Sequence, residues 1–212
     1  MKVKSAAADP SRPAVRRTQA QRTAATRALL LEQARNLFAD RGFSAVSTQS
    51  IVDAAGVTRG ALYHQFSDKT ALFAAVYEEL EREIVADIAE QIMAAQPVDP
   101  LEAMRLGARL FLDRCAGPDV QRIVLIDAPA VLGWDRWREV GVKYGLGVIE
   151  GMLAQAVAQG AIPEQPLRPS AHVLLGALDE AALYVSRAAD PRRAKVEMYG
   201  VCDRILHGIA QR

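Results

Sequence analysis

The residues best suited to chemistry are three consecutive ones, Thr58, Arg59 and Gly60, at the start of a short helical pattern. A hydroxyl, a guanidinium and a residue without a side chain suit contact with a nucleic acid. The forked guanidinium of Arg59 matches the O6 and N7 acceptors of guanine, and it binds a phosphate equally well. Gly60 would let the helix approach a groove closely. The pattern therefore predicts nucleic-acid binding, with base and phosphate contact as equal alternatives for Arg59.

Two further residues extend this predicted surface. Thr48 begins a short helical pattern, where its hydroxyl and the free backbone N–H groups suit a phosphate and where it also suits a plain N-cap. Lys69 falls in the first turn of a long helix, although the helix dipole favours acidic residues at that end. A phosphate contact explains Lys69 better than a stabilising role does.

Two short helices joined at Gly56 must position these side chains. Ser47-Thr48 starts the first helix, and Thr58 is the predicted cap of the second, which runs to Phe66. Glycine accepts the positive φ of a tight turn, and four apolar residues hold the two helices together: Ile51, Ala55, Val57 and Leu62. With a preceding helix over about 23–41, this is a helix-turn-helix pattern whose second helix enters the major groove.

The rest of the chain shows helical periodicity and no sustained alternation typical of strands. Apolar residues recur every four positions over about 68–95, and glycines and prolines separate later helical stretches at about 99–115, 119–127, 135–159, 168–188 and 191–210. The fold class is therefore all-α with about nine helices. We expect a flexible basic tail over 1–21, a helix-turn-helix domain over 22–67, and a helical body over 68–212.

Charge and composition limit the class of protein. Residues 1–66 carry ten Lys and Arg against four Asp and Glu, whereas the remainder is mildly acidic, so only one end is expected to meet a polyanion. No apolar run is long enough to span a membrane, and no secretory signal is visible. Cys115 and Cys202 lie far apart without a zinc-type pattern. These features predict a cytoplasmic protein.

One continuous string carries a family resemblance. Gly56-Val-Thr-Arg-Gly-Ala-Leu-Tyr-His-Gln-Phe-Ser-Asp-Lys-Thr-Ala-Leu72 closely resembles the DNA-binding segment of the TetR (tetracycline-repressor) family of bacterial transcription regulators. So do Ala39-Asp-Arg-Gly-Phe43 and Thr48. The resemblance is specific over about 24–80 and rests on helix number and length elsewhere. The chain departs from the family pattern at Ala61, often threonine in the family, and at Gln65.

The resemblance implies a regulator that binds double-stranded operator DNA as a homodimer. By resemblance, Tyr63 and His64 bind backbone phosphates, and the last two helices form the dimer interface. A repressor released from a palindromic operator by a small-molecule inducer is the usual outcome, and an activator of the same fold is the alternative. The tail residues Arg16, Arg17 and Arg22 either reach the DNA or have no specific role.

The resemblance also implies an inducer pocket in the body, for an inducer whose identity the sequence does not give. Each candidate is either a ligand contact or ordinary core: Met104, Phe111, Ile126, Trp134, Trp137, Tyr144, Met152 and His172. The two tryptophans are the stronger candidates because each N–H needs a partner. Asp127, within an apolar run, either binds backbone groups or orients a polar group of the inducer.

An enzyme, or a simple carrier, is the rival class. The three histidines lie far apart, and no nucleophile-elbow, Walker or dinucleotide-binding pattern is present. His172 with Asp179 or Glu180 could be a metal site on one helix face, but a solvated or interface face explains the spacing better. We therefore expect no catalytic residue, no metal and no cofactor.

Overall fold

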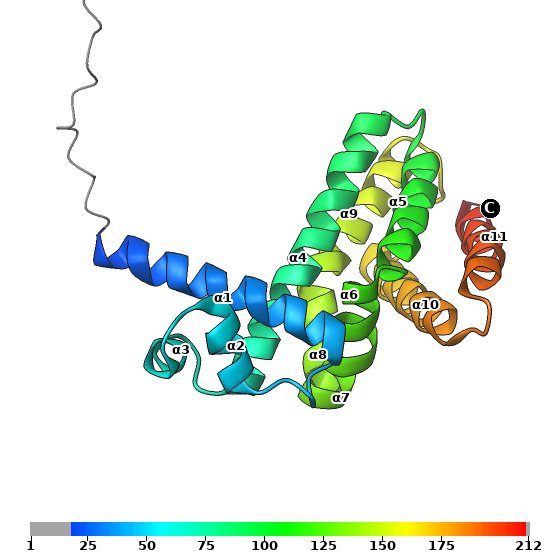
Figure 1. The fold of residues 1–212 in the computed structure, drawn as a ribbon. Helices are drawn as coiled ribbons and strands as arrows, with labels where there is room; N and C mark the ends of the chain where they lie inside the picture. Colours follow the sequence, from blue (N-terminus) through cyan, green and yellow to red (C-terminus); the bar gives the residue numbers. More distant parts are fainter. Residues whose placement is uncertain (1–17, 211–212) are drawn as a thin grey trace, which may run out of the picture.

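The computed structural model describes residues 18–210, and within that range it contains nine continuous helical segments and no strand (Figure 1). The first three helices are α1 (Gln19–Arg41), α2 (Thr48–Ala55) and α3 (Arg59–Gln65), which together form a head. The long helix α4 (Lys69–Ala95) runs from this head into a body made of the remaining helices (Figure 1). No helix among the described residues is long and apolar enough to cross a membrane.

Helix α1 begins four residues earlier than its apolar periodicity predicts. Thr18 accepts a hydrogen bond from the backbone N–H of Gln21, and the Gln21 side chain accepts one from the backbone N–H of Thr18. This reciprocal capping box satisfies two N–H groups that a helix start leaves open, so the helix extends into the segment expected to be a tail. Most of the predicted tail, residues 1–17, lies outside the described residues.

The head has the predicted helix-turn-helix geometry. Gly56 ends α2 with φ 62° and ψ 31°, the left-handed conformation that glycine adopts without strain. The Thr58 hydroxyl caps α3 by accepting the backbone N–H of Ala61. Ser47, not Thr48, is the N-cap of α2, so Thr48 is the first helical residue.

The head and the start of α4 share one core. The side chains of Leu30, Phe38, Ile51 and Leu62 are fully buried, and so are those of Leu72, Phe73, Tyr77 and Leu80 on α4. Phe38, Phe43 and Phe73 pack edge-to-face or tilted with ring centroids 5.1–5.8 Å apart. Because this cluster continues into the body, α4 is fixed to the head through packing rather than through a flexible hinge.

Two body helices are interrupted by wider π-helical turns. α5 (Pro100–Cys115) ends at a turn, and then α6 (Pro118–Val120), the π-helix η1 (Gln121–Asp127) and α7 (Ala128–Leu132) follow one another without a break. Pro129, expected to end a helix, lies inside this segment. A proline ring clashes with the carbonyl four residues earlier in a regular helix, and the π-helical turns before Pro129 change that spacing. α8 (Trp134–Gly141), the π-helix η2 (Val142–Leu146) and α9 (Gly147–Ala158) form the second such segment.

The last two helices are α10 (Leu167–Arg187) and α11 (Pro191–Ala210), which pack against each other and against α5 (Figure 1). Leu174, Leu175, Ala182 and Val185 of α10 are buried within the subunit. A second apolar cluster joins α10 to α9 and to Met104 of α5. The far end of the body therefore has its own packing, distinct from the core shared with the head.

Candidate nucleic-acid interface and ligand cavity

Helix α3 presents its polar residues to solvent and its apolar residues to the head's core. Leu62 is fully buried and Phe66, just after the helix, is 5% exposed. Thr58, Arg59, Gly60, Tyr63 and His64 are all exposed. The predicted DNA-binding residues of α3 therefore share one accessible face of a helix that is fixed from behind.

Three predicted contact residues from two helices meet at this surface. The Arg59 guanidinium lies 3.4 Å from the Tyr63 hydroxyl and 5.6 Å from the centre of its ring. The hydrogen bond with Arg59 lowers the pKa of Tyr63 most, and a second hydrogen bond, with Thr48, lowers it further. The hydroxyl thus bridges the first turn of α2 and the exposed face of α3. A guanidinium, two hydroxyls and a helix N-terminus together suit one phosphate group.

Gly60 is not required by the packing of the head. A Cβ built on Gly60 would meet only the Thr58 hydroxyl oxygen, at 3.9 Å, and the residue is exposed. Glycine inside a helix is less favourable than alanine by about 0.5–1 kcal/mol. The fold therefore does not explain a glycine at this position, and the close approach of Gly60 to a groove stays a prediction.

Lys69 has a structural role that the helix-dipole argument did not predict. Its ammonium donates to the backbone carbonyls of Phe43 and Val46, at 2.9 and 2.8 Å, and lies 4.0 Å from the centre of the Phe43 ring. It thereby fixes the loop between α1 and α2 to the start of α4. Lys69 therefore does have the stabilising role that the sequence disfavoured, and a phosphate contact by Lys69 stays a prediction.

Gln65, a departure from the family pattern, contacts the protein rather than solvent. Its side-chain amide donates to the carbonyl of Thr23 in α1 at 3.5 Å, and Arg27 of α1 lies over the Phe66 ring at 4.5 Å. These contacts fix the end of α3 against α1.

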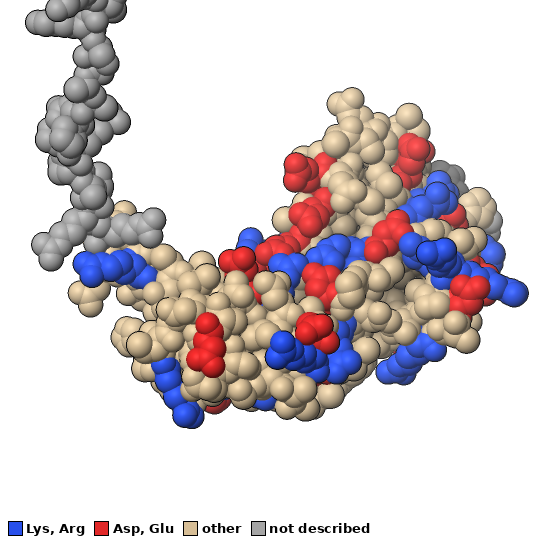
Figure 2. Space-filling model, in the orientation of Figure 1, with Lys and Arg blue, Asp and Glu red and all other residues tan. Residues whose placement is uncertain are grey.

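Lys and Arg side chains lie at the outer end of α1 and below α3, whereas acidic side chains follow α4 above the head (Figure 2).

The body contains a mainly apolar cavity of about 120 Å³, enclosed by α4, α5, α9, α10 and α11 and by Gly141 and Gly145. Three of the eight predicted ligand contacts line it: Met104 and Phe111 of α5 and Met152 of α9. Their apolar side chains come from neighbouring helices, which is why separate periodic patterns could identify them.

The other five candidates do not line this cavity. Ile126 is 47% exposed and Trp134 is 60% exposed, and His172 lies on the solvent side of α10. Tyr144 packs against the core of the head and α4. No group of three potential metal ligands occurs among residues 18–210, so the imagined site at His172 has no support there.

Trp137, the fifth of these candidates, is part of the core. It is 4% exposed, and its indole N–H donates to the carbonyl of Val124 in η1 at 3.0 Å. Its own carbonyl accepts the Tyr77 hydroxyl of α4 at 2.9 Å. The indole N–H of Trp137 therefore has its partner within the protein and needs no ligand. Through these two hydrogen bonds Trp137 connects α4, α8 and η1.

Two acidic residues at the cavity were not predicted from the sequence as ligand contacts. Glu81 of α4 and Asp179 of α10 are the charged residues of its otherwise apolar lining. Asp179 pairs with Arg138 at 2.5 Å and keeps 18% of its side-chain surface accessible. Burial, and next the charge of Asp179, raises the pKa of Glu81 to about 7, while burial raises that of Asp179 to about 6. Apolar periodicity could not identify Glu81 and Asp179 as cavity residues, because both are charged.

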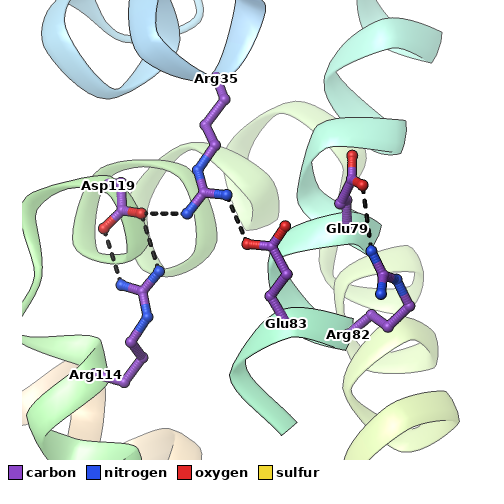
Figure 3. Close-up of polar contacts among 6 residues, drawn as sticks. All are labelled: Arg35, Glu79, Arg82, Glu83, Arg114 and Asp119. Carbon is purple, nitrogen blue, oxygen red and sulfur yellow. Dashed lines mark hydrogen bonds and ion pairs between the residues drawn. The ribbon is translucent and has the colours of Figure 1, made fainter. Parts of the chain in front are cut away.

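Polar contacts connect the head to the body. Asp127, at the end of η1, accepts the backbone N–H of Phe43 at 2.8 Å, so it binds a backbone group and does not line the cavity. Arg35 of α1 contacts both Glu83 of α4 and Asp119 of α6 (Figure 3). Asp119 also pairs with Arg114 of α5 through two hydrogen bonds. The head is therefore bound to α4, α6 and the end of η1 through these three acidic side chains.

Two family models match the chain. Residues 30–76 match the model of bacterial regulatory proteins of the tetR family, and residues 101–209 match a tetracyclin repressor-like C-terminal domain. The first match contains all of α2 and α3, and the second contains most of the helices that enclose the cavity.

Similar proteins are transcription regulators. The crystal structure of a TetR-family transcriptional regulator from Pectobacterium atrosepticum has 32% identity and a TM-score of 0.79, covering 92% of this chain and 99% of that one. The regulator AcrR of Shigella flexneri is 40% identical over 38% of this chain and 37% of its own length. The Tn10 TetC protein of Escherichia coli is 26% identical over 63% of this chain and 66% of its own. The chain belongs to the TetR family of bacterial transcription regulators.

Proposed function

We propose that the protein is a dimeric repressor that binds a palindromic DNA operator and is released by a small molecule bound in the body. The observation that carries this proposal is the exposed face of α3, where Arg59 and Tyr63 meet Thr48 of α2. In the same rigid unit, α4 extends from the head to a ligand-sized cavity. The similar proteins described above include regulators of transcription, which supports this proposal.

In this proposal α3 enters the major groove, with Arg59 and Gly60 facing the bases. Tyr63, His64 and Thr48 contact phosphates on the strand beside the groove. Phosphate contacts set orientation and make binding salt-dependent, whereas base contacts set sequence preference. The exposure of Arg59, Gly60, Tyr63 and His64 and the partial exposure of Thr48, together with the buried Leu62 behind them, support this orientation of the helix.

The dimer contact is proposed on the outer faces of α10 and α11. Val173 and Tyr184 of α10 are 70% and 52% exposed, and Val196 of α11 is 66% exposed. Val173 and Tyr184 are eleven residues apart, about three helical turns, so they lie on one face. Exposed large apolar side chains grouped on two helices indicate a protein contact. Leu174 and Leu175 of α10 are buried within the subunit, so they face away from this proposed contact.

Release of DNA is proposed to act through α4, η1 and the head contacts. A ligand among α4, α5 and α10 that favours a different packing of α4 would move Tyr77 and, through its hydrogen bond, Trp137 and η1. Asp127 of η1 and Lys69 of α4 both bind the loop before α2, so a shift there changes the orientation of the head. The ligand can shift the equilibrium only by its difference in affinity for the two states.

Selection of bound sequences from a random pool of duplex DNA tests this function. We expect enrichment of a palindrome whose half-sites lie about one helical turn apart, roughly 34–36 Å, because a two-fold dimer presents two α3 helices. Arg59→Ala should relax the base preference if Arg59 pairs with guanine, and should weaken all sequences alike if it binds phosphate. Recovery of no enriched sequence at low salt would refute the regulator function.

A further inference from the structure

The cavity has a distinct chemical polarity. Of its lining residues, Glu81 and Asp179 are acidic, none is basic, and the remainder are apolar side chains, glycines and one cysteine, Cys202. The nearby cation, Arg138, pairs with Asp179 but does not line the cavity. A negatively charged ligand would therefore face two carboxylates without a cation in the lining, and burial of a charge without a partner is costly.

Glu81 has an incomplete set of partners. The Tyr77 hydroxyl lies within hydrogen-bonding reach of Glu81, but its one proton is donated to the carbonyl of Trp137, so the carboxylate competes with that carbonyl for a single donor. Burial, and next the like charge of Asp179, raises the pKa of Glu81, because both disfavour its ionised form in the folded chain. Part of Glu81 is accessible to a water-sized molecule, and that residue lines the cavity.

We propose that the cavity binds a small apolar amine, whose protonated amino group lies against Glu81 and Asp179 and whose hydrocarbon part fills the apolar remainder. The inference rests on the proposed function, because it names the class of molecule that controls the protein. The two carboxylates with one arginine leave a net negative charge that a single ammonium balances. An ammonium also supplies three N–H donors to the carboxylates of Glu81 and Asp179, which have few donors within the protein.

Size restricts the hydrocarbon part. The cavity of about 120 Å³ is slightly smaller than the roughly 150 Å³ apolar cavity that is known to hold one benzene molecule. A chain or ring of about five or six carbon atoms therefore fills it. Gly107, Gly141 and Gly145 line it, and a Cβ on Gly107 or Gly145 would lie only 3.3 or 3.2 Å from Ile92 or Leu175.

Three probes of nearly equal size test the inference with the full-length wild-type protein. We expect n-pentylamine to bind about tenfold or more tightly than 1-pentanol, because a hydrogen bond to a charged group is stronger than a neutral one. Pentanoate should bind more weakly than both. Affinities are measured by chemical-shift titration in nuclear magnetic resonance spectra, without DNA. Equal binding of amine and alcohol, tightest binding of pentanoate, or no amine binding would overturn the proposal.

A matched pair of variants assigns the effect to the cavity. Glu81→Gln keeps the shape of the side chain and should weaken n-pentylamine about tenfold while changing 1-pentanol by less than about threefold. Glu79→Gln makes the same change two residues away, on a side chain that is 39% exposed and does not line the cavity, and should change neither. Equal losses in both variants would overturn the proposal. Since DNA selection is measured separately, a failed amine site leaves the proposed regulator function intact.

Discussion

The guanidinium of Arg35 and the carboxylate of Asp119 lie 2.8 Å apart and join the head to the body. They are 84 residues apart in the chain. The same guanidinium contacts Glu83 of α4 at 2.6 Å, and Arg114 of α5 holds the other side of Asp119 (Figure 3). Although burial opposes it, hydrogen bonds from Arg114 and Arg35 hold the pKa of Asp119 well below its usual range. This cluster is the polar joint between α1 and three body helices.

Arg35→Met should therefore weaken the attachment of the head. The change removes two ion pairs whose side chains are only 23–35% exposed, and we expect a loss of about 1–2 kcal/mol in the free energy of unfolding. Chemical denaturation at neutral pH measures this loss. Arg82→Met is the matched control, because Arg82 is 56% exposed and pairs only with Glu79 one turn away (Figure 3). Equal stability losses in the two variants would contradict a structural role for Arg35.

Lys69→Met should lower stability. The variant keeps much of the side-chain length but removes the donors to Phe43 and Val46, leaving two partly buried carbonyls without that partner. We expect a loss of about 1–3 kcal/mol in the free energy of unfolding. The dependence of DNA affinity on salt separates the two roles of Lys69. A structural role leaves the slope unchanged, whereas a direct phosphate contact lowers it by about one phosphate.

Gly60→Ala should separate folding from DNA binding. A Cβ at this position meets no atom closer than 3.9 Å, so the variant should fold and gain up to about 1 kcal/mol of stability from better helix propensity. Affinity for the selected operator should fall, because the added methyl group lies between α3 and the groove. Thermal unfolding and fluorescence anisotropy with labelled duplex measure the two effects. Undiminished operator affinity would show that α3 does not approach the DNA closely at Gly60.

The free energy of unfolding should fall between about pH 5 and pH 8 because of Glu81. Burial first, and Asp179 second, raises the pKa of Glu81 from 4.5 to about 7, so the folded chain binds the proton more tightly than the unfolded chain does. The stabilisation is fully present below about pH 4.5 and is lost as the pH rises through 7. We expect a relative loss of about 1–3 kcal/mol compared with Glu81→Gln, measured by denaturant unfolding at several pH values.

The neighbours of Glu81 define the controls for that measurement. Tyr77 of α4 and Cys115 of α5 both have pKa values raised by burial first, which keeps them neutral throughout this pH range. Asp179 of α10, paired with Arg138 of α8, has its pKa raised by burial to about 6 and is coupled to Glu81, so Asp179→Asn is needed as a second variant to separate its contribution. Identical pH profiles of wild type and Glu81→Gln would show that Glu81 has an ordinary pKa.

Local signals in the sequence predicted the head well. Cap residues and apolar spacing identified α2, α3 and α4 to within one or two residues, because Gly56, Thr58 and Asp68 act through neighbouring backbone groups. The start of α1 was missed because the capping box at Thr18 lies outside the apolar stripe. The π-helices η1 and η2 were also missed, because apolar periodicity does not distinguish π-helical turns from α-helical ones.

The cavity was only partly predictable. Met104, Phe111 and Met152 follow apolar periodicity, and three such residues do line the cavity. Trp134 and Trp137 were favoured for their N–H groups, but Trp137 satisfies its own within the core and Trp134 is exposed. Whether a residue faces a cavity or the core depends on how two helices are rotated against each other. That rotation depends on tertiary packing, so the apolar pattern of one helix does not predict it.

The central claim is that occupation of the cavity changes the affinity of the head for DNA, and filling the cavity from within tests it without any ligand. Gly141 lines the cavity, and a Cβ built on it meets no atom within 4 Å. Gly141→Met therefore places a flexible apolar side chain where a ligand would bind. Gly151→Met is the control, because Gly151 is an exposed helical glycine with the same open surroundings and does not line the cavity.

The decisive measurement is the affinity of both variants for the selected operator, with folding verified by thermal unfolding. Coupling between two sites is typically about 1–3 kcal/mol, so Gly141→Met should bind the operator roughly 5- to 150-fold more weakly than wild type. Gly151→Met should bind as wild type does. A folded Gly141→Met protein with unchanged or increased operator affinity would contradict release of DNA by occupation of the cavity.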